Sequence, residues 1–305
     1  MPYAIESPVK EPNTSHRHRT LISLLFLLFI LPAAHAQQRY PASGVVLSVD
    51  PSHHSMRVSC DEIRGVMERM IMTFAVPDAK SLASVTRGAI VDFTLVVNEY
   101  DSHAENVRVR RYESADREPS KVRRLEALDE ALRGPAHTLA VGQAVPDFAL
   151  IDQQKRPVHF HDFAGKVVAL NFVYTRCVLP EYCIRSSNNF GALQKQFHDR
   201  LGKDLVLLTV TFDPVHDQPE ILREYSKNWK ADPDNWRFLT GTSPDVQHVC
   251  DLFGVNFVPD EGLFAHSLHT AIVGRDGKLV ANLEGNEFTS KQLADLLEAT
   301  LDPAN

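Results

Sequence analysis

Cysteine is scarce in this sequence, with four residues in a chain of 305: Cys60, Cys177, Cys183 and Cys250. A disulfide-stapled scaffold needs a higher density of cysteine in a smaller domain. These cysteines are therefore predicted to carry chemistry or to fill a core. A basic surface is also missing, because the 32 Lys and Arg residues are scattered among 39 acidic ones and the net charge is −7. Nucleic acid is therefore not an expected partner.

The N-terminal apolar run is too short to span a bilayer. It extends from Leu21 to Leu31, about 11 residues, whereas a transmembrane helix needs roughly 20. Arg17 and Arg19 precede the run, and the small-x-small sequence Ala-His-Ala follows at residues 34–36. This layout is typical of a signal peptide. We expect residues 1–36 to be a leader and the remainder to work in the periplasm or another extracytoplasmic compartment. A membrane tether formed by an uncleaved segment is the alternative.

The length predicts two domains, because single hydrophobic cores stop growing at about 250 residues. Residues 37–112 show short Val- and Thr-rich runs at 44–49, 56–59, 72–76, 90–97 and 106–109, separated by turn sequences. They predict a small all-β, OB-like barrel. Residues 113–138 are charged and predict a linker, with an amphipathic helix over 123–133.

Residues 139–305 alternate between strand and helix patterns. Continuous apolar runs at 167–174 and 205–212 are typical of strands buried on both faces. Helical spacing covers residues 189–201, 219–229, 243–253 and 289–301, and a hairpin over 270–273 and 278–283 surrounds the Asp276-Gly277 turn. This order, preceded by a hairpin-like segment, predicts an α/β domain of thioredoxin-like architecture.

Cys177 and Cys183 lie in the loop after the first buried strand. A thiol at the N-terminus of a helix has a lowered pKa, which favours the thiolate needed for metal binding or redox catalysis. Five residues, including Pro180, separate the two cysteines, so the loop must curl for the sulfurs to converge. A structural disulfide and two unrelated core thiols are the alternatives.

His266 is the candidate third ligand, because it directly precedes the strand predicted at 270–273. Two thiolates and one imidazole form a soft set that suits Cu(I), and with an added ligand they also hold Cu(II). His269 is the second choice, since it falls at the start of that strand. Cys250 lies within helical spacing and is predicted to be a buried core thiol.

At these residues the chain resembles the Sco/SenC family of copper proteins. The resemblance covers about residues 142–301 and includes VPDF at 145–148, YTRC at 174–177, TFDPVHDQPE at 211–220, and His266 ten residues before Asp276. It implies a thioredoxin fold, copper held by Cys177, Cys183 and His266, and a role in cytochrome oxidase copper-centre assembly or thiol redox chemistry.

Two features depart from the family pattern. Five residues separate the cysteines where the family usually has three, and Val178 and Ile184 stand where prolines are common. Asp213 matches an acidic position near the family's site. Two roles for it remain open: orienting or screening the cysteine loop, or simply starting the Asp-Pro turn.

The predicted barrel contains a second group of soft ligands. Cys60, Met67, Met70 and Met72 place four sulfur atoms within thirteen residues, and Met70 and Met72 share one face of a predicted strand. The segment is similar to the small periplasmic copper-binding barrels of copper/silver efflux systems, in which a His and a Met-x-Met pair hold Cu(I). Cys60 stands at about the expected His position, and Met67 lies near that of an aromatic lid. A methionine-lined core is the equally weighted alternative.

Two functions follow from these residues. The first is a metallochaperone that delivers copper to a client cuproprotein, such as a cytochrome oxidase subunit, with a thiol reductase as a possible second partner. The second is a thiol-disulfide oxidoreductase with Cys177 and Cys183 as its catalytic pair. A peroxiredoxin-like peroxidase is disfavoured, because it requires Thr or Ser and Pro where Tyr174 and Leu170 stand.

Overall fold

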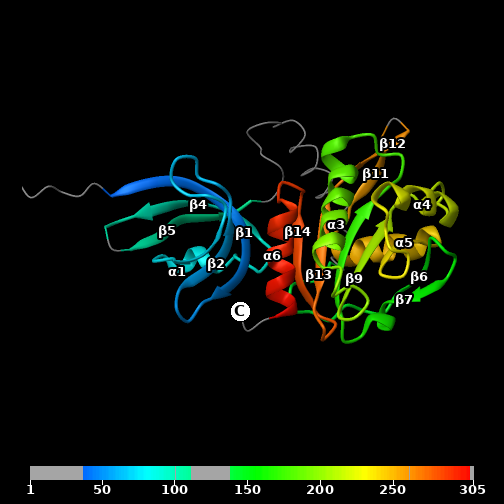
Figure 1. Ribbon diagram of the computed structural model, residues 1–305, viewed down its shortest axis with the longest axis horizontal. Coiled ribbons are helices and arrows are strands. Elements are labelled where there is room, and N and C mark those ends of the chain that lie inside the picture. Colours follow the sequence, from blue (N-terminus) through cyan, green and yellow to red (C-terminus); the bar gives the residue numbers. More distant parts are fainter. Residues whose placement is uncertain (1–36, 100, 111–137, 261, 303–305) are drawn as a thin grey trace, which may run out of the picture. The chain divides into compact units, whose positions relative to one another are not determined.

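The computed structural model describes residues 37–99, 101–110, 138–260 and 262–302 (Figure 1). The predicted leader, its cleavage site and the predicted linker helix lie outside these ranges. No helix in the described part of the chain is long and apolar enough to cross a membrane.

The first domain is a closed five-stranded barrel with strand order β1-β2-β3-β5-β4. A short helix, α1 (Ala79–Leu82), lies between β3 and β4. The strands are β1 (Gln38–Asp50), β2 (Ser55–Cys60), β3 (Ile71–Ala75), β4 (Ile90–Val97) and β5 (Ser102–Val109). The predicted all-β barrel is confirmed.

Alternating side chains explain the core of this barrel. In β2, Met56, Val58 and Cys60 are 1%, 0% and 1% exposed, and they belong to one buried cluster with Phe74 and Phe93. Side chains two positions apart lie on the same face of a strand, so every second residue enters the barrel. Closure of the barrel removes the open edges at which a small sheet would pair with other chains.

The second domain is built on a seven-stranded sheet of order β14-β13-β8-β9-β10-β6-β7. Strands β8, β9 and β10 are parallel, whereas β13 and β14 form an antiparallel hairpin at one side. The strands are β6 (Ala149–Asp152), β7 (Pro157–His159), β8 (Val167–Val173), β9 (Leu205–Thr211), β10 (Trp236–Thr240), β13 (His269–Val273) and β14 (Leu279–Glu284). A separate hairpin consists of β11 (Phe257–Asp260) and β12 (Leu263–His266).

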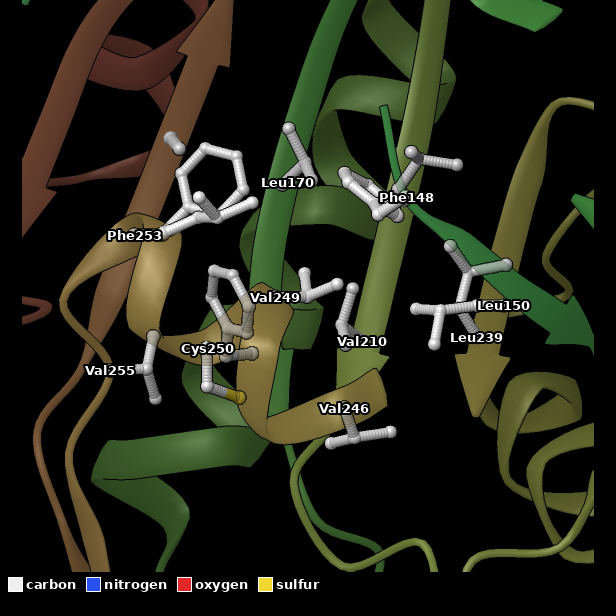
Figure 2. Packing of buried hydrophobic residues seen from close by; sticks show 14 of the residues in the cluster. Phe148, Leu150, Leu170, Val210, Leu239, Val246, Val249, Cys250, Phe253 and Val255 are labelled. Atoms are coloured by element: carbon white, nitrogen blue, oxygen red, sulfur yellow. The ribbon is translucent and has the colours of Figure 1, made fainter. Parts of the chain in front are cut away.

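Helices cover both faces of this sheet (Figure 1). Leu170 and Val210 point to the face that α5 (Ser243–Phe253) covers, whereas Ala169 and Leu207 point to the opposite face. Figure 2 shows Val246, Val249, Cys250 and Phe253 from α5 against the sheet. The other face packs against α3 (Arg185–Gln196), α4 (Pro219–Ser226) and α6 (Ser290–Leu301), and the short helical turns are η1 (Phe160–Phe163), η2 (Pro180–Ile184) and η3 (Lys227–Trp229).

The thioredoxin-like architecture is confirmed, and it contains three strands, β10, β11 and β12, that the sequence pattern does not predict. β10 has five residues, too few for a clear pattern, and its position between β9 and β6 depends on long-range pairing. The β11–β12 hairpin is also not predicted, although β12 ends at His266. The predicted helix at 189–201 begins earlier, at Arg185, and ends at Gln196.

Candidate metal centre

Cys177, Cys183 and His266 converge at the carboxyl end of β8. Cys177 follows this strand, Cys183 lies in η2, and His266 ends β12. Their candidate ligand atoms all lie within 4.8 Å of one another. The residues are 7%, 0% and 8% exposed, so the group faces the protein interior. Loops at the carboxyl ends of parallel strands are where α/β sheets bind ligands.

The cysteine loop curls through η2, a single turn of wide, π-type helix. Pro180 occupies its first turn, where the missing backbone N–H is not needed. Tyr182 leaves the helical region of backbone conformation, with φ −107° and ψ −111°, and the chain is kinked there. This kink brings Cys183 back towards Cys177 across the five intervening residues. The loop between Cys177 and Cys183 therefore curls, as the five-residue spacing predicted.

Hydrogen bonds stabilise the thiolate form of Cys177. The Cys183 thiol donates to its sulfur, and further bonds come from His266 and from the backbone N–H groups of Cys183 and Leu179. These bonds, led by the one from Cys183, lower the pKa of Cys177 to about 4 despite burial. The pKa of Cys183 is raised, because its proton is shared with Cys177 and because the side chain is buried. At neutral pH the pair therefore carries one negative charge and one proton.

A backbone hydrogen bond fixes the orientation of the His266 imidazole. Its Nδ1 lies 2.9 Å from the carbonyl oxygen of Ser267. A carbonyl only accepts, so Nδ1 donates to it, and Nε2 is the ring nitrogen left to bind a metal ion. The ring centroid lies 4.8 Å from that of Phe212, 5.7 Å from that of Tyr174 and 6.1 Å from that of Tyr182. These aromatic rings exclude water from the ligand group.

Arg176 links the cysteine loop to the hairpin that carries His266. Its Nε and Nη2 donate to one oxygen of Asp213, at 3.0 and 2.8 Å. Its Nη1 donates to the carbonyl oxygen of Gly262, in the β11–β12 loop, at 3.0 Å. His216 bonds the other oxygen of Asp213 at 2.8 Å. Asp213 thus contacts the cysteine loop through Arg176 and also stands in its turn, so both roles left open for it have a structural counterpart.

A second buried carboxylate fixes the start of the same loop. Asp217 is fully buried and accepts from the backbone N–H of Thr175 at 3.0 Å and from its hydroxyl at 2.5 Å. The Thr211 hydroxyl, at the end of β9, donates to the same carboxylate. Burial raises the pKa of Asp217. Asp217 lies in the stretch 211–220 that carries the family resemblance, but its residue type alone does not predict this role.

The two other candidates of this domain lie elsewhere. His269, the second choice as ligand, is outside the convergent group, and its Nδ1 donates to Oδ1 of Asn282 at 3.1 Å. Cys250 is fully buried on α5 within the hydrophobic cluster of Figure 2. Burial raises its pKa, which keeps it a neutral thiol. This environment agrees with the predicted core role.

In the barrel, strand register brings the soft side chains to one end. Val58 pairs with Met72, and the Cys60 N–H donates to the Met70 carbonyl at 2.9 Å, which continues the same register. Directly opposite residues share a face, so Cys60, Met70 and Met72 share one. Met70 precedes β3 and is 47% exposed, whereas Cys60 is buried. Burial, with a smaller contribution from Asp61, raises the pKa of Cys60 to about 12.

Comparison with known families assigns both domains. A family model described as SCO1/SenC matches residues 137–302, just over half of the chain. This protein belongs to the SCO1/SenC family. A second model, described as copper binding periplasmic protein CusF, matches residues 39–107. The chain thus carries a CusF-like copper-binding domain ahead of its SCO1/SenC domain, as both resemblances predicted.

Individual relatives match the SCO1/SenC domain. A putative copper-binding protein of Stutzerimonas stutzeri is 30% identical over 142 residues, 45% of this chain and 67% of that protein. The SCO1 protein homolog of Bacillus subtilis is 27% identical over 149 residues, 48% of this chain and 76% of that protein. The crystal structure of Arabidopsis thaliana ScoI with copper bound covers 53% of this chain and 99% of its own, at 22% identity and a TM-score of 0.47.

The sequence predicted the three convergent side chains of the SCO1/SenC domain and pointed to Asp213 beside them, but it did not reveal Arg176 and Asp217 as supports. Arg176 and Asp217 carry no chemical signature of their own, because arginine and aspartate are common in loops. A signal was present in the tight spacing of Asp213 and Asp217 within one loop, next to the cysteine strand. Their function depends on partners 37 to 42 positions distant in the chain, which only the fold reveals.

Proposed function

We propose that this protein is an extracytoplasmic copper metallochaperone whose main copper site consists of Cys177, Cys183 and His266. The observation that carries the proposal is the convergence of two sulfurs and one imidazole nitrogen within 4.8 Å in a buried, aromatic-lined site. Two thiolates and an imidazole suit Cu(I). The low pKa of Cys177 keeps its sulfur in the thiolate form that binds metal, and the bond from Nδ1 of His266 to a carbonyl leaves Nε2 as the ligand atom.

Copper is the cargo in this proposal, and the protein supplies ligands that exchange it. Cu(I) first meets the Cys177 thiolate, and Cys183 joins after releasing its proton to solvent. Transfer reverses these steps when a client thiolate or imidazole replaces one ligand at a time. Val178 and Leu179, on the cysteine loop, are 70% and 49% exposed. Such apolar side chains beside the site support docking of a client during exchange.

The client and the compartment follow from the family and from the predicted leader. Membership of the SCO1/SenC family supports a cuproprotein client such as a cytochrome oxidase subunit. The CusF match, to a model described as periplasmic, and the leader predicted at residues 1–36 support an extracytoplasmic location. We further propose that the barrel binds a second Cu(I) at Cys60, Met70 and Met72, with Met67 as a neighbouring sulfur, and relays it.

The first experiment counts Cu(I) bound per chain after anaerobic loading and desalting. We expect near two coppers for the parent protein and near one for both Cys177→Ala and Met70→Ala. Cys250→Ala is the matched control, because it removes a buried thiol outside both proposed sites and should leave the count unchanged. A parent protein that retains no copper would refute the chaperone function. An unchanged count in Met70→Ala would refute the barrel site alone.

A thiol-disulfide oxidoreductase is the second candidate, favoured by the low pKa of Cys177 beside a protonated Cys183. The Cys177 thiolate would attack a substrate disulfide, which releases one substrate thiol and forms a mixed disulfide. Cys183 would then attack the Cys177 sulfur, which releases the second substrate thiol and forms an internal Cys177–Cys183 disulfide. Turnover of a disulfide substrate with a thiol reductant supports this function. If Cys183→Ser abolishes turnover while the parent retains no Cu(I), the protein is a reductase rather than a chaperone.

A further inference from the structure

A second group of potential ligands lies on the exposed edge of the sheet in the SCO1/SenC domain. Asp147, His159 and His161 bring their ligand atoms within 4.8 Å of one another, and all three are exposed. Asp147 lies two residues before β6, His159 ends β7, and His161 lies in η1. Strand β7 is the last of the seven in the sheet order, on the opposite side from β13 and β14. None of these residues takes part in the thiol site.

The local fold holds the three side chains together. Ala149 pairs with His159 in the β6–β7 hairpin, and the Phe160 N–H donates to the Phe148 carbonyl at 3.0 Å. The rings of Phe148 and Phe160 stack at 5.2 Å between centroids, and both residues are buried. Side chains alternate along paired extended segments, so burial of these two rings directs their neighbours to the solvent. The packing of Phe148 and Phe160 in the core therefore fixes the backbone that carries Asp147, His159 and His161.

The distances already approach those around a bound ion. Nδ1 of His161 lies 2.8 Å from Oδ2 of Asp147, and Nδ1 of His159 lies 3.8 Å from the same oxygen. The two imidazole rings stack at 5.1 Å between centroids. Around a square-planar or tetragonal ion such as Cu(II), with bonds of about 2.0 Å, neighbouring ligand atoms lie about 2.8 Å apart. Small side-chain rotations therefore suffice to place these atoms around one ion.

Backbone contacts limit the movement of the two flanking carboxylates. The His161 N–H donates to Oδ1 of Asp147 at 2.9 Å, and the His159 N–H donates to Asp162 at 2.9 Å. Asp162 also lies 3.7 Å from Nε2 of His161, so a second carboxylate neighbours the group. Two imidazoles and one oriented carboxylate are a preorganised set, which reduces the ordering cost of binding.

We propose that Asp147, His159 and His161 form a second metal site on the SCO1/SenC domain, one that binds a divalent, borderline-soft ion such as Cu(II). Imidazole and carboxylate ligands suit Cu(II) and Zn(II) rather than Cu(I), and Cu(II) binds most tightly in the divalent series. The exposed position leaves the remaining coordination positions to water. The site therefore differs from the buried thiol site in oxidation state, ligand type and exchange with solvent.

The test uses the full chain with Cys177→Ser and Cys183→Ser, so that the thiol pair neither binds nor reduces the probe ion. Cu(II) is added, and electron paramagnetic resonance and equilibrium dialysis measure its environment and stoichiometry. We expect one tightly bound Cu(II) with nitrogen hyperfine coupling. Loss of a residue that only supports a metal ligand typically weakens metal binding roughly 10- to 100-fold. His159→Gln removes a direct ligand, so we expect its Cu(II) affinity to fall by at least that much.

His198→Gln is the matched control, because His198 is another exposed histidine beside a carboxylate, 3.2 Å from Asp199. It should leave the affinity and the spectrum unchanged. His159→Gln is preferred to Asp147→Asn because Asp147 accepts the backbone N–H of His161, whereas the exposed ring of His159 only stacks on that of His161 and lies 3.8 Å from Asp147. Equal affinity of the parent and His159→Gln, or equal losses in His159→Gln and His198→Gln, would overturn the proposal. Neither result bears on the Cu(I) count that tests the thiol site.

Discussion

Replacement of Asp217 by alanine should loosen the cysteine loop and destabilise the whole domain. The carboxylate accepts the backbone N–H of Thr175 at 3.0 Å and the hydroxyls of Thr175 and Thr211. A buried donor left without its acceptor costs about 1–3 kcal/mol. The backbone N–H cannot turn elsewhere, and each of the two hydroxyls loses a hydrogen bond worth about 1 kcal/mol even if it rotates. The expected loss of unfolding free energy is therefore about 3–5 kcal/mol. This is a large part of a typical total of about 5–15 kcal/mol.

Asp217→Asn separates the hydrogen bonds from the charge. The amide keeps the shape and one acceptor oxygen, which takes the place of the oxygen that accepts from the Thr175 N–H and the Thr211 hydroxyl. The Thr175 hydroxyl, which faces the other oxygen, can reverse to accept from the new NH₂ group. Because burial raises the pKa of Asp217, the folded state disfavours its ionised form, and a neutral amide relieves that cost. We therefore expect a loss of about 1–2 kcal/mol for Asn, clearly smaller than that for Ala.

Chemical denaturation followed by tryptophan fluorescence measures both variants, since Trp229 and Trp236 lie in this domain. A competition assay with a chromogenic Cu(I) chelator then reports whether the loop still presents Cys177. Asp217→Ala should lose Cu(I) affinity as well as stability, because Thr175 is two residues from Cys177. If Ala costs less than about 1 kcal/mol, or if Asn is as harmful as Ala, the carboxylate does not position the loop through these bonds.

Three further predictions concern the same site. The pKa of Cys177 is lowered to about 4, so its thiolate persists above that pH. The rate of Cys177 alkylation, measured by mass spectrometry, should therefore be nearly constant from about pH 5.5 to 8 and fall only as the pH approaches 4. The alkylation rate of an ordinary thiol instead falls about tenfold per pH unit below about 8.5. His266→Ala should lower Cu(I) affinity in the chelator assay at least about tenfold, while His269→Ala leaves it within about twofold, and equal losses would contradict the ligand assignment. Arg176→Lys keeps the charge but loses the paired donors to buried Asp213, so a loss of about 1–2 kcal/mol in denaturation is expected, and an unchanged midpoint would contradict a structural role for this link.

Regular elements with a strong pattern were predictable from the sequence. The predicted helix at 243–253 coincides with α5, and the apolar runs at 167–174 and 205–212 contain β8 and β9. Apolar residues recur at a regular spacing along each of these elements, so the sequence pattern that predicts them is strong. β10 was overlooked because five residues give little periodicity, and because its place is decided by pairing with β9 and β6.

The sequence by itself determined the family, the two kinds of domain and the chemical type of the ligands, because these depend on local patterns and on the identities of Cys177, Cys183 and His266. Only the tertiary structure decided the protonation of that group and its supports. The pKa of Cys177 depends on donors from its own curled loop and from β12, and Asp217 and Arg176 act on partners far away in the chain. The same holds for Asp147, which meets His159 and His161 only when β6 pairs with β7. Electrostatic and hydrogen-bond energies depend on distances of a few ångströms, and chain folding sets those distances between residues that the sequence keeps apart.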